Sequence, residues 1–166
     1  MENKHFDAII VDLPDPSHPD INKVYSEFFY ARLKELLSAD GAIAIQSTSP
    51  FHTRDAFISI GKTLASAGFT TEQYHTNVPT FGEWGWSIGT LMGSSASTRI
   101  ASHDSLPVPS QWLSKPQMLA SFVFAPNYFK GADKINSNPL GSHQIYQYHQ
   151  NAWKQRDGVF FIDHKQ

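Results

Sequence analysis

The sequence predicts an α/β fold in which a mostly parallel sheet ends in an antiparallel strand and is followed by C-terminal helices. Apolar runs and amphipathic segments alternate over residues 6–78 in the order strand, helix, strand, helix, strand, which is typical of parallel sheets with helical crossovers. A further apolar run, 84–92, follows after a short connection, and so short a connection permits only an antiparallel return. After residue 93 this rhythm gives way to serine-rich sequence and turns.

A proline-rich turn separates the first predicted strand from the first predicted helix. FDAIIVD (6–12) is apolar and β-branched, which favours a buried strand. Residues 24–37 carry apolar side chains at helical spacing, with Lys34 and Glu35 on the solvent side. The residues expected on the buried face of this helix are Val24, Phe28, Leu33, Leu36 and Leu37. Gly41, just beyond, is expected to stop the helix in a left-handed conformation.

Two strands and one helix complete the alternating region. GAIAIQS (41–47) predicts a second buried strand, and TTEQYHTNV (70–78) predicts a third. Between them, residues 53–69 predict a helix with Thr53 as its N-cap and Gly68 as its stop.

The C-terminal part is predicted to consist of loop and helix. The serine-rich stretch 94–110 indicates a long surface loop, and 115–126 indicates a short helix bounded by prolines. Turn residues fill 136–143, and 142–156 predicts an amphipathic helix. The packing residues expected on that last helix are Ile145, Tyr148 and Trp153.

Length and composition exclude several classes of protein. The 166 residues carry a net charge of −2 with a pI of about 6.4, which gives no electrostatic footprint for nucleic acid or an anionic membrane. There is no cysteine, so disulfides, thiolate catalysis and cysteine-ligated metals are excluded. No apolar run is long enough to cross a bilayer, and the start lacks the pattern of a signal peptide. We therefore expect a cytoplasmic chain without nucleic-acid or membrane contacts.

Histidine and serine patterns give no further catalytic signal. The eight histidines show no zinc-type spacing, so we expect no metal site and interpret all eight, His143 and His149 included, as structural or surface residues. The serines lack the G-x-S-x-G elbow of a serine hydrolase.

A glycine-rich nucleotide loop is not found near the N-terminus of the chain. Sheets of this kind normally open with a strand and a G-x-G-x-x-G turn, whereas the first strand here leads directly into an acidic turn. The sequence therefore predicts the C-terminal half of a Rossmann-like, methyltransferase-type sheet. We expect residues 1–93 to form this partial domain, and 94–166 to form a serine-rich loop and a helical extension packed on it.

Asp12 and Asp15 are the first candidates for a functional site. Ligands of open α/β sheets bind beyond the carboxyl ends of the strands, where Asp12 closes a strand and Asp15, held between Pro14 and Pro16, can return to the same space. Two converging carboxylates suit an amine, since one can accept its proton while the other holds its charge. Metal binding lacks a third ligand. Alternatively, Asp12 caps the turn and Asp15 is solvated.

Two further groups follow predicted strands. Gln46 ends the second strand, and its amide can hydrogen-bond either a ligand or a neighbouring loop. Phe81, Trp84 and Trp86 lie in or near the glycine-containing loop after the third strand. These aromatic rings can form the wall of a pocket for an alkyl chain or a cation, or they can be core residues under a loop.

Three sequence blocks resemble the spermidine synthase (polyamine aminopropyltransferase) family. IIVDLPDPSHP is similar to that family's strand ending in D-x-x-D-P with a further proline three residues on. VYSEFFYARLKELLSADGAIAIQSTSP resembles its tyrosine-containing helix and D-G turn, and NVPTFGEWGWSIG resembles its P-T-aromatic stretch. The blocks occur in the family's order across residues 6–92. DLPDP and FGEWGW look most like the bacterial branch whose longer members carry membrane helices.

The resemblance implies a role for each matched residue. Asp12 would accept the proton of the attacking putrescine amine, and Asp15 would anchor the diamine. Gln46 and Phe81 would line the diamine site, although the family more often has tyrosine at the position of Phe81. Pro19 would lie against the methylthioadenosine part of the cosubstrate.

The implied reaction is transfer of an aminopropyl group from decarboxylated S-adenosylmethionine to putrescine, without a metal or redox cofactor. The implied partners are a small-molecule diamine and a nucleoside cosubstrate, and a homodimer is also expected. Because the glycine-rich loop of the family is not in the chain, we expect the chain alone to be inactive as a C-terminal part of the enzyme. The alternative is a non-catalytic α/β module that self-associates or binds a partner through a sheet edge. The resemblance leaves open a membrane-attached parent protein.

Overall fold

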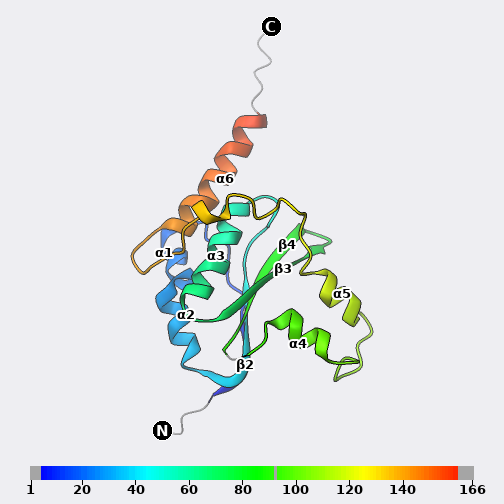
Figure 1. Ribbon diagram of the computed structural model, residues 1–166. Helices are drawn as coiled ribbons and strands as arrows, with labels where there is room; N and C mark the ends of the chain where they lie inside the picture. The colour runs from blue at the N-terminus through cyan, green and yellow to red at the C-terminus, as the bar shows by residue number, and fades with distance from the viewer. Residues whose placement is uncertain (1–4, 92, 161–166) are drawn as a thin grey trace.

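A four-stranded mixed sheet forms the centre of the computed structural model, which describes residues 5–91 and 93–160 (Figure 1). The strands are β1 (Phe6–Val11), β2 (Leu37–Gln46), β3 (Thr70–Val78) and β4 (Gly82–Thr90). They lie side by side in the order β1-β2-β4-β3. The fold is therefore α/β with a crossover between β1 and β2, as the sequence predicts.

The pairing of the strands confirms the antiparallel return. β1 and β2 are parallel, with Val11 opposite Ile45, whereas β4 runs antiparallel to both β2 and β3. Residues 79–81 alone join β3 to β4, and Gly82 after them adopts a φ of 76°, a conformation that glycine reaches without strain. β4 begins two residues before the expected strand.

Helices surround the sheet unevenly. The α-helices are α1 (Pro19–Asn22), α2 (Glu27–Lys34), α3 (Arg54–Ser66), α4 (Ala96–Ser102), α5 (Lys115–Ala120) and α6 (Gln144–Phe160), and the 3-10 turns are η1 (Lys23–Tyr25) and η2 (Ala132–Lys134). Figure 1 shows α4 and α5 beside β3 and β4 at the lower right, while α6 rises from the top of the molecule. Contacts between α3 and α6 join the C-terminal helix to the body of the fold.

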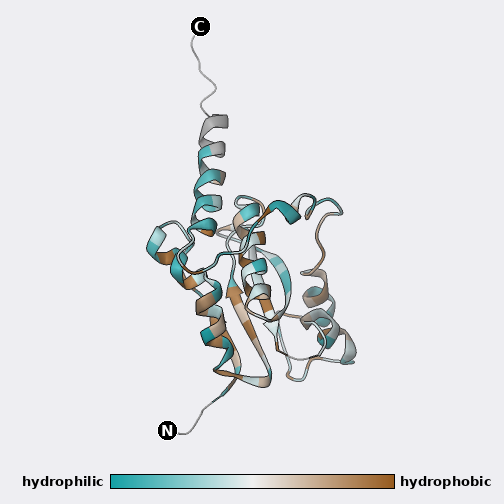
Figure 2. Cartoon of the chain, turned by 60° about the vertical axis from the view of Figure 1, so that its left-hand side comes forward, coloured by the Kyte–Doolittle hydropathy of each residue, from teal (hydrophilic) through white to brown (hydrophobic). Residues whose placement is uncertain are grey.

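The main core lies between the sheet and helices α2, α3 and α6. Its buried residues are Val11, Tyr25, Tyr30, Leu37, Ile43, Ile45, Ala56, Ile60, Leu64, Phe69 and Ile145. Figure 2 shows hydrophobic residues along the strands at the centre of the molecule. Burial of each large apolar side chain contributes about 1.5–3 kcal/mol, so this cluster dominates the stabilisation of the sheet. The buried Ile145 confirms the packing role expected for it on the last helix.

The helix expected over residues 24–37 is wrong in its start and its end, and its expected buried face is right only in part. Val24 and Leu33 pack against the core and Leu37 is buried in β2, whereas Leu36 is 45% exposed. Ser26 is extended and caps α2 by accepting a hydrogen bond from the Phe29 amide at 3.2 Å, so the preceding residues form a separate 3-10 turn. The residues that are fully buried are Tyr25 and Tyr30, whereas Phe28 is 56% exposed. The apolar pattern predicted the buried residues only in part, because it left out Tyr25 and Tyr30, whose rings are fully buried.

Two expectations about the first strands are also wrong. Gly41 does not stop a helix, because it lies inside β2, where a Cβ atom would come within 2.8 Å of the Leu37 side chain. β1 is an edge strand that within the described residues pairs only with β2. Phe6 and Ile10, which share one face of the strand, are exposed, while Val11 on the other face is buried. The apolar run of β1 predicted burial on both faces, and only one face is covered.

The C-terminal part contains more helix than the serine-rich composition suggests. Residues 96–102 of the expected loop form α4, whose first turn is held by the Glu72 carboxylate of β3. This carboxylate accepts hydrogen bonds from the Ser97 amide at 2.7 Å and the Ser97 hydroxyl at 2.6 Å. The acceptor comes from a distant strand, so the local sequence did not indicate the helix. The helix expected over 115–126 ends at Ala120.

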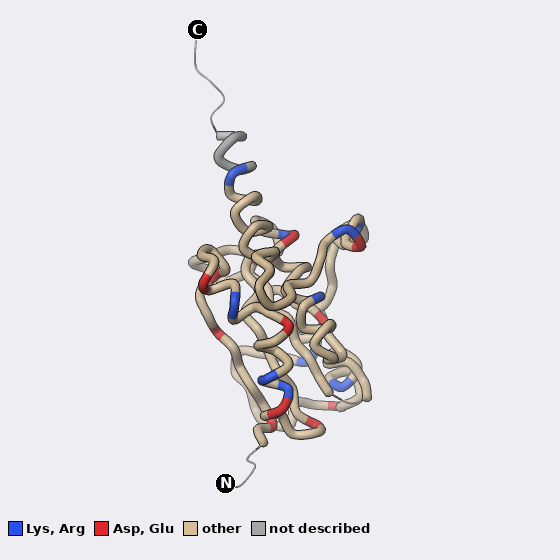
Figure 3. Tube along the Cα trace, turned by 90° about the vertical axis from the view of Figure 1, so that its left-hand side faces the viewer, with Lys and Arg blue, Asp and Glu red and all other residues tan. Residues whose placement is uncertain are grey.

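Charged residues of both signs are interspersed along the described trace (Figure 3). No helix in the described part of the chain is long and apolar enough to cross a membrane. The described residues also contain no group of three or more His, Cys, Asp or Glu side chains placed to hold a metal ion.

Candidate active site

The carboxyl ends of the parallel strands β1 and β2 meet at one edge of the sheet, where a cavity of about 470 Å³ opens. The residues that line it are Asp12, Leu13, Pro14, Asp15, Gln46, Val78, Phe81, Trp84 and Trp86. The loop between β3 and β4 reaches the same edge because Trp86 of β4 pairs with Gln46 of β2. The structure thus brings Asp12, Asp15, Gln46 and Phe81 together.

The buried hydroxyl of Tyr25 contacts the backbone of the acidic turn that carries Asp12 and Asp15. It lies 3.1 Å from the Pro14 carbonyl and 3.3 Å from the Leu13 carbonyl, and it donates to Oε1 of Gln46 at 2.9 Å. Burial raises the pKa of Tyr25, and the negative charges of Asp15 and Asp12 raise it further. The phenol therefore stays protonated at neutral pH and acts as a donor that fixes the turn.

Gln46 is occupied at both ends of its amide. Its Oε1 accepts from Tyr25, and its Nε2 donates to Oδ1 of Asp15 at 2.8 Å. The side chain is buried, so its chief structural effect is to orient the Asp15 carboxylate.

The two acids have different environments. Burial raises the pKa of Asp15, but the interactions with His149 and Gln46 outweigh this effect, and its pKa lies below the ordinary value of 3.8. The carboxylate of Asp12 is exposed and makes no hydrogen bond or ion pair within the described residues. One acid is thus held as a charged, oriented group, while the other is available to a ligand.

Aromatic rings also line the cavity. Phe81 is 65% exposed, and its ring centroid lies 5.5 Å from that of Trp84. Trp86 is stacked on Tyr74, with their centroids 5.5 Å apart. Aromatic faces and a pair of carboxylates in one cavity suit a flexible cation with an apolar chain.

Pro19 is placed apart from these residues. It opens the short helix α1, and it is not among the described residues that line the cavity. Its expected contact with a cosubstrate therefore stays a prediction.

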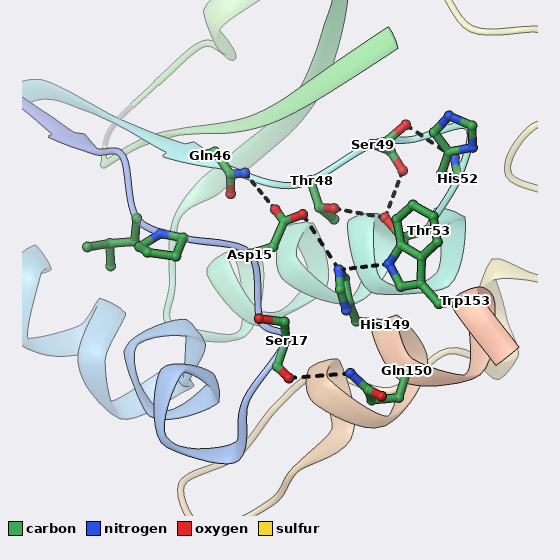
Figure 4. Close-up of polar contacts among 12 residues, drawn as sticks. Asp15, Ser17, Gln46, Thr48, Ser49, His52, Thr53, His149, Gln150 and Trp153 are labelled. Carbon is green, nitrogen blue, oxygen red and sulfur yellow. Dashed lines mark hydrogen bonds and ion pairs between the residues drawn. The ribbon is translucent and has the colours of Figure 1, made fainter. Parts of the chain in front are cut away.

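Two residues near Asp15 were not anticipated from the sequence. His149 of α6 is buried, and its Nε2 lies 3.6 Å from Oδ2 of Asp15 (Figure 4). Thr48, just after β2, has a φ of 62°, unusual for a β-branched residue, and its hydroxyl lies 2.9 Å from that of Thr53. No short sequence motif marks either residue. The only signal for His149 was its position four residues before Trp153 on a predicted helix.

The sheet order and the position of the site define a class, that of α/β domains whose ligands bind at the carboxyl ends of parallel strands. The model of the spermine/spermidine synthase domain matches residues 1–99, and the chain belongs to this family. α6 and its His149 lie outside the matched region.

Curated and structural relatives agree with this assignment. The chain is 56% identical over 154 residues to the polyamine aminopropyltransferase of Shewanella oneidensis, covering 93% of this chain and 27% of that protein. The chain thus spans about a quarter of the length of this relative. Two solved structures share the fold: spermidine synthase from Thermotoga maritima (TM-score 0.59, 20% identity, 78% of this chain and 44% of that one) and a spermidine synthase in complex with the transition-state analogue AdoDATO (TM-score 0.58, 19% identity, 78% and 43%).

Proposed function

We propose that this chain supplies the amine-acceptor site of a polyamine aminopropyltransferase. The observation that carries the proposal is the strand-end cavity, which is lined by an oriented Asp15 with a lowered pKa, an exposed Asp12 and several aromatic rings. The similarity to a curated polyamine aminopropyltransferase supports the same reaction class.

In this proposal the two acids have different roles: Asp12 deprotonates the attacking amine, and Asp15 binds the other end of the diamine. An ammonium group has no free electron pair, so Asp12 first takes its proton. The freed nitrogen then attacks the carbon beside the sulfonium of decarboxylated S-adenosylmethionine. The new C–N bond forms as the C–S bond breaks. The electron pair of the C–S bond stays on sulfur, which leaves in neutral methylthioadenosine. No electron is gained or lost overall, so the step calls for no redox partner.

Asp15 holds the other end of the substrate in the same proposal. Its carboxylate is fixed by Gln46 on one oxygen, which favours pairing with the distal ammonium of putrescine in a single orientation. The four-carbon chain of the diamine then lies along Phe81 and Trp84. Pro19 is proposed to face the nucleoside part of the cosubstrate.

Calorimetric titration of the chain with putrescine, with and without methylthioadenosine, tests this function. We expect Asp12→Asn and Asp15→Asn each to weaken putrescine binding by roughly tenfold or more, since each removes a charged contact. Asp104→Asn is the matched control, because Asp104 is an exposed acid that does not line the cavity. Absence of binding to the folded wild-type chain, or equal binding by all variants, would refute the proposal.

The exposed edge of β1 favours a second, non-catalytic candidate. Phe6 is 52% exposed and Ile10 is 80% exposed on a strand that pairs on one side only within the described residues. Unpaired edges with exposed apolar side chains favour pairing with another strand. The second candidate is therefore self-association through β1. Measurement of the molecular mass of the chain in solution tests it, because a dimer has twice the mass of the monomer.

A further inference from the structure

His149 links the C-terminal helix to the acid pair. It is 4% exposed, and its Nε2 lies 3.6 Å from Oδ2 of Asp15 and 3.2 Å from Nε1 of Trp153 (Figure 4). The other ring nitrogen, Nδ1, is buried without a hydrogen-bond partner in the described part of the chain. The polar contacts found for this buried imidazole are therefore both made by Nε2.

The two neighbours of Nε2 require opposite protonation states of this atom. An indole N–H only donates, and an ionised carboxylate only accepts. Nε2 must carry a proton to donate to Asp15, and it must lack one to accept from Trp153. A favourable contact between the imidazole and Asp15 therefore requires the proton on Nε2.

The Asp15 carboxylate is consequently held from both sides. Gln46 donates to Oδ1 at 2.8 Å, and His149 faces Oδ2. A carboxylate with one partner on each oxygen has its plane fixed, which reduces the reorganisation needed when a ligand ammonium arrives. The pKa of Asp15, which these contacts keep below its ordinary value despite burial, agrees with this arrangement.

We propose that His149 is a positioning residue of the amine site, which holds the Asp15 carboxylate in a fixed orientation for a substrate ammonium group. This inference rests on the proposed function, because it presumes that Asp15 binds an amine. It extends the site beyond the region matched by the family model to a residue of α6. Among the described residues, the contacts place two ionisable groups near the imidazole: Asp15 and, across the ring of Trp153, His52, whose ring centroid lies 5.9 Å from that of Trp153.

Two substitutions separate positioning from packing. His149→Phe keeps an aromatic ring but removes the donor, whereas His149→Gln places an amide N–H near the position of Nε2. The control is Gln150→Ala, because Gln150 is the neighbouring α6 residue that contacts the same turn, donating to the Ser17 carbonyl at 3.3 Å. This control removes a contact between α6 and the turn without touching Asp15.

The measurements are the pKa of Asp15, from the carbon-13 shift of its carboxyl group, and the putrescine affinity of the folded chain by calorimetry. We expect His149→Phe to raise the pKa of Asp15 and to weaken putrescine binding by roughly tenfold, the effect of losing one polar contact to a charged group. His149→Gln should restore most of both values. Gln150→Ala should change neither.

The outcomes are distinct. An unchanged Asp15 pKa and unchanged affinity in His149→Phe would overturn the inference, as would equal losses of affinity in His149→Phe, His149→Gln and Gln150→Ala, which would indicate helix docking alone. If the wild-type chain binds no putrescine while His149→Phe still raises the pKa of Asp15, the proposed function fails. The control of the Asp15 carboxylate by His149 would then be confirmed.

Discussion

Asp15 depends on neighbours from three parts of the chain for its charge and orientation. Gln46 at the end of β2 and His149 on α6 contact its two oxygens, and the Thr48 hydroxyl also lowers its pKa. Burial opposes ionisation of the group, so these partners must outweigh the loss of solvation. A carboxylate in this position stabilises the folded state only while it is charged.

The first prediction concerns the acid dependence of stability. Because the folded-state pKa of Asp15 lies below its ordinary value of 3.8, the ionised group adds to the free energy of unfolding at pH values above 3.8. This contribution is lost as the pH falls from that value through the folded-state pKa. Asp15→Asn should therefore show a smaller loss of stability over this window, measured by urea unfolding at a series of pH values. A loss as steep as that of the wild type, with Asp104→Asn as control, would contradict the prediction.

At the scale of elements, the buried side chain of Asn138 links the short helices α1 and η1 near the N-terminus to the start of α6. Asn138 is fully buried, and its Nδ2 donates to the carbonyls of Asn22 at 3.2 Å and Tyr25 at 3.1 Å. Its Oδ1 accepts from the Ser142 hydroxyl at 2.9 Å and the Gln144 amide at 3.1 Å. The start of α6 is therefore tied to α1 and η1 by polar contacts.

Removal of this amide should be costly. Asn138→Ala leaves several buried donors and acceptors without partners, and we expect the free energy of unfolding to fall by about 2–4 kcal/mol. Asn136→Ala, at an exposed position in the same segment, should change it by no more than about 0.5 kcal/mol. Urea unfolding of both variants checks this. Similar midpoints for the two would show that the buried contacts of Asn138 contribute little.

At the scale of the whole molecule, β1 lies at one edge of the sheet, where within the described residues it pairs only with β2. If it pairs with a second copy, sedimentation velocity over a range of concentrations should show a dimer. Ile10→Lys should then weaken the association, because it places a charge on the exposed edge strand. Trp112→Lys is the control, since Trp112 is 88% exposed but lies outside the sheet. A wild-type chain that stays monomeric at all concentrations would rule out self-association through β1.

Much of the fold could be predicted because strand patterns and turns act locally. The range 70–78 matches β3, and the short connection after it forced the antiparallel β4. The buried residues of η1 and α2 could not be predicted, because burial of Tyr25 and Tyr30 depends on partners elsewhere, such as Gln46 for the hydroxyl of Tyr25. α4 was missed for the same reason, since its first-turn acceptor is Glu72 of β3.

The candidate site divides in the same way. Asp12, Asp15, Gln46 and Phe81 could be grouped from the sequence because parallel strands bring their carboxyl ends to one edge. Their roles stay predictions until binding is measured. His149 could not be assigned to the group, because its distance from Asp15 is set by how α6 packs on α3.

The sequence by itself determined the alternation of strands and helices, the antiparallel return and the acidic turn at a strand end, because these depend on residue patterns and on the length of connections. Only the tertiary structure decided which face of each helix is buried, which strand edge is exposed and which side chains hold Asp15. These features arise from contacts between segments far apart in the chain, and local sequence patterns do not predict the free energy of such contacts.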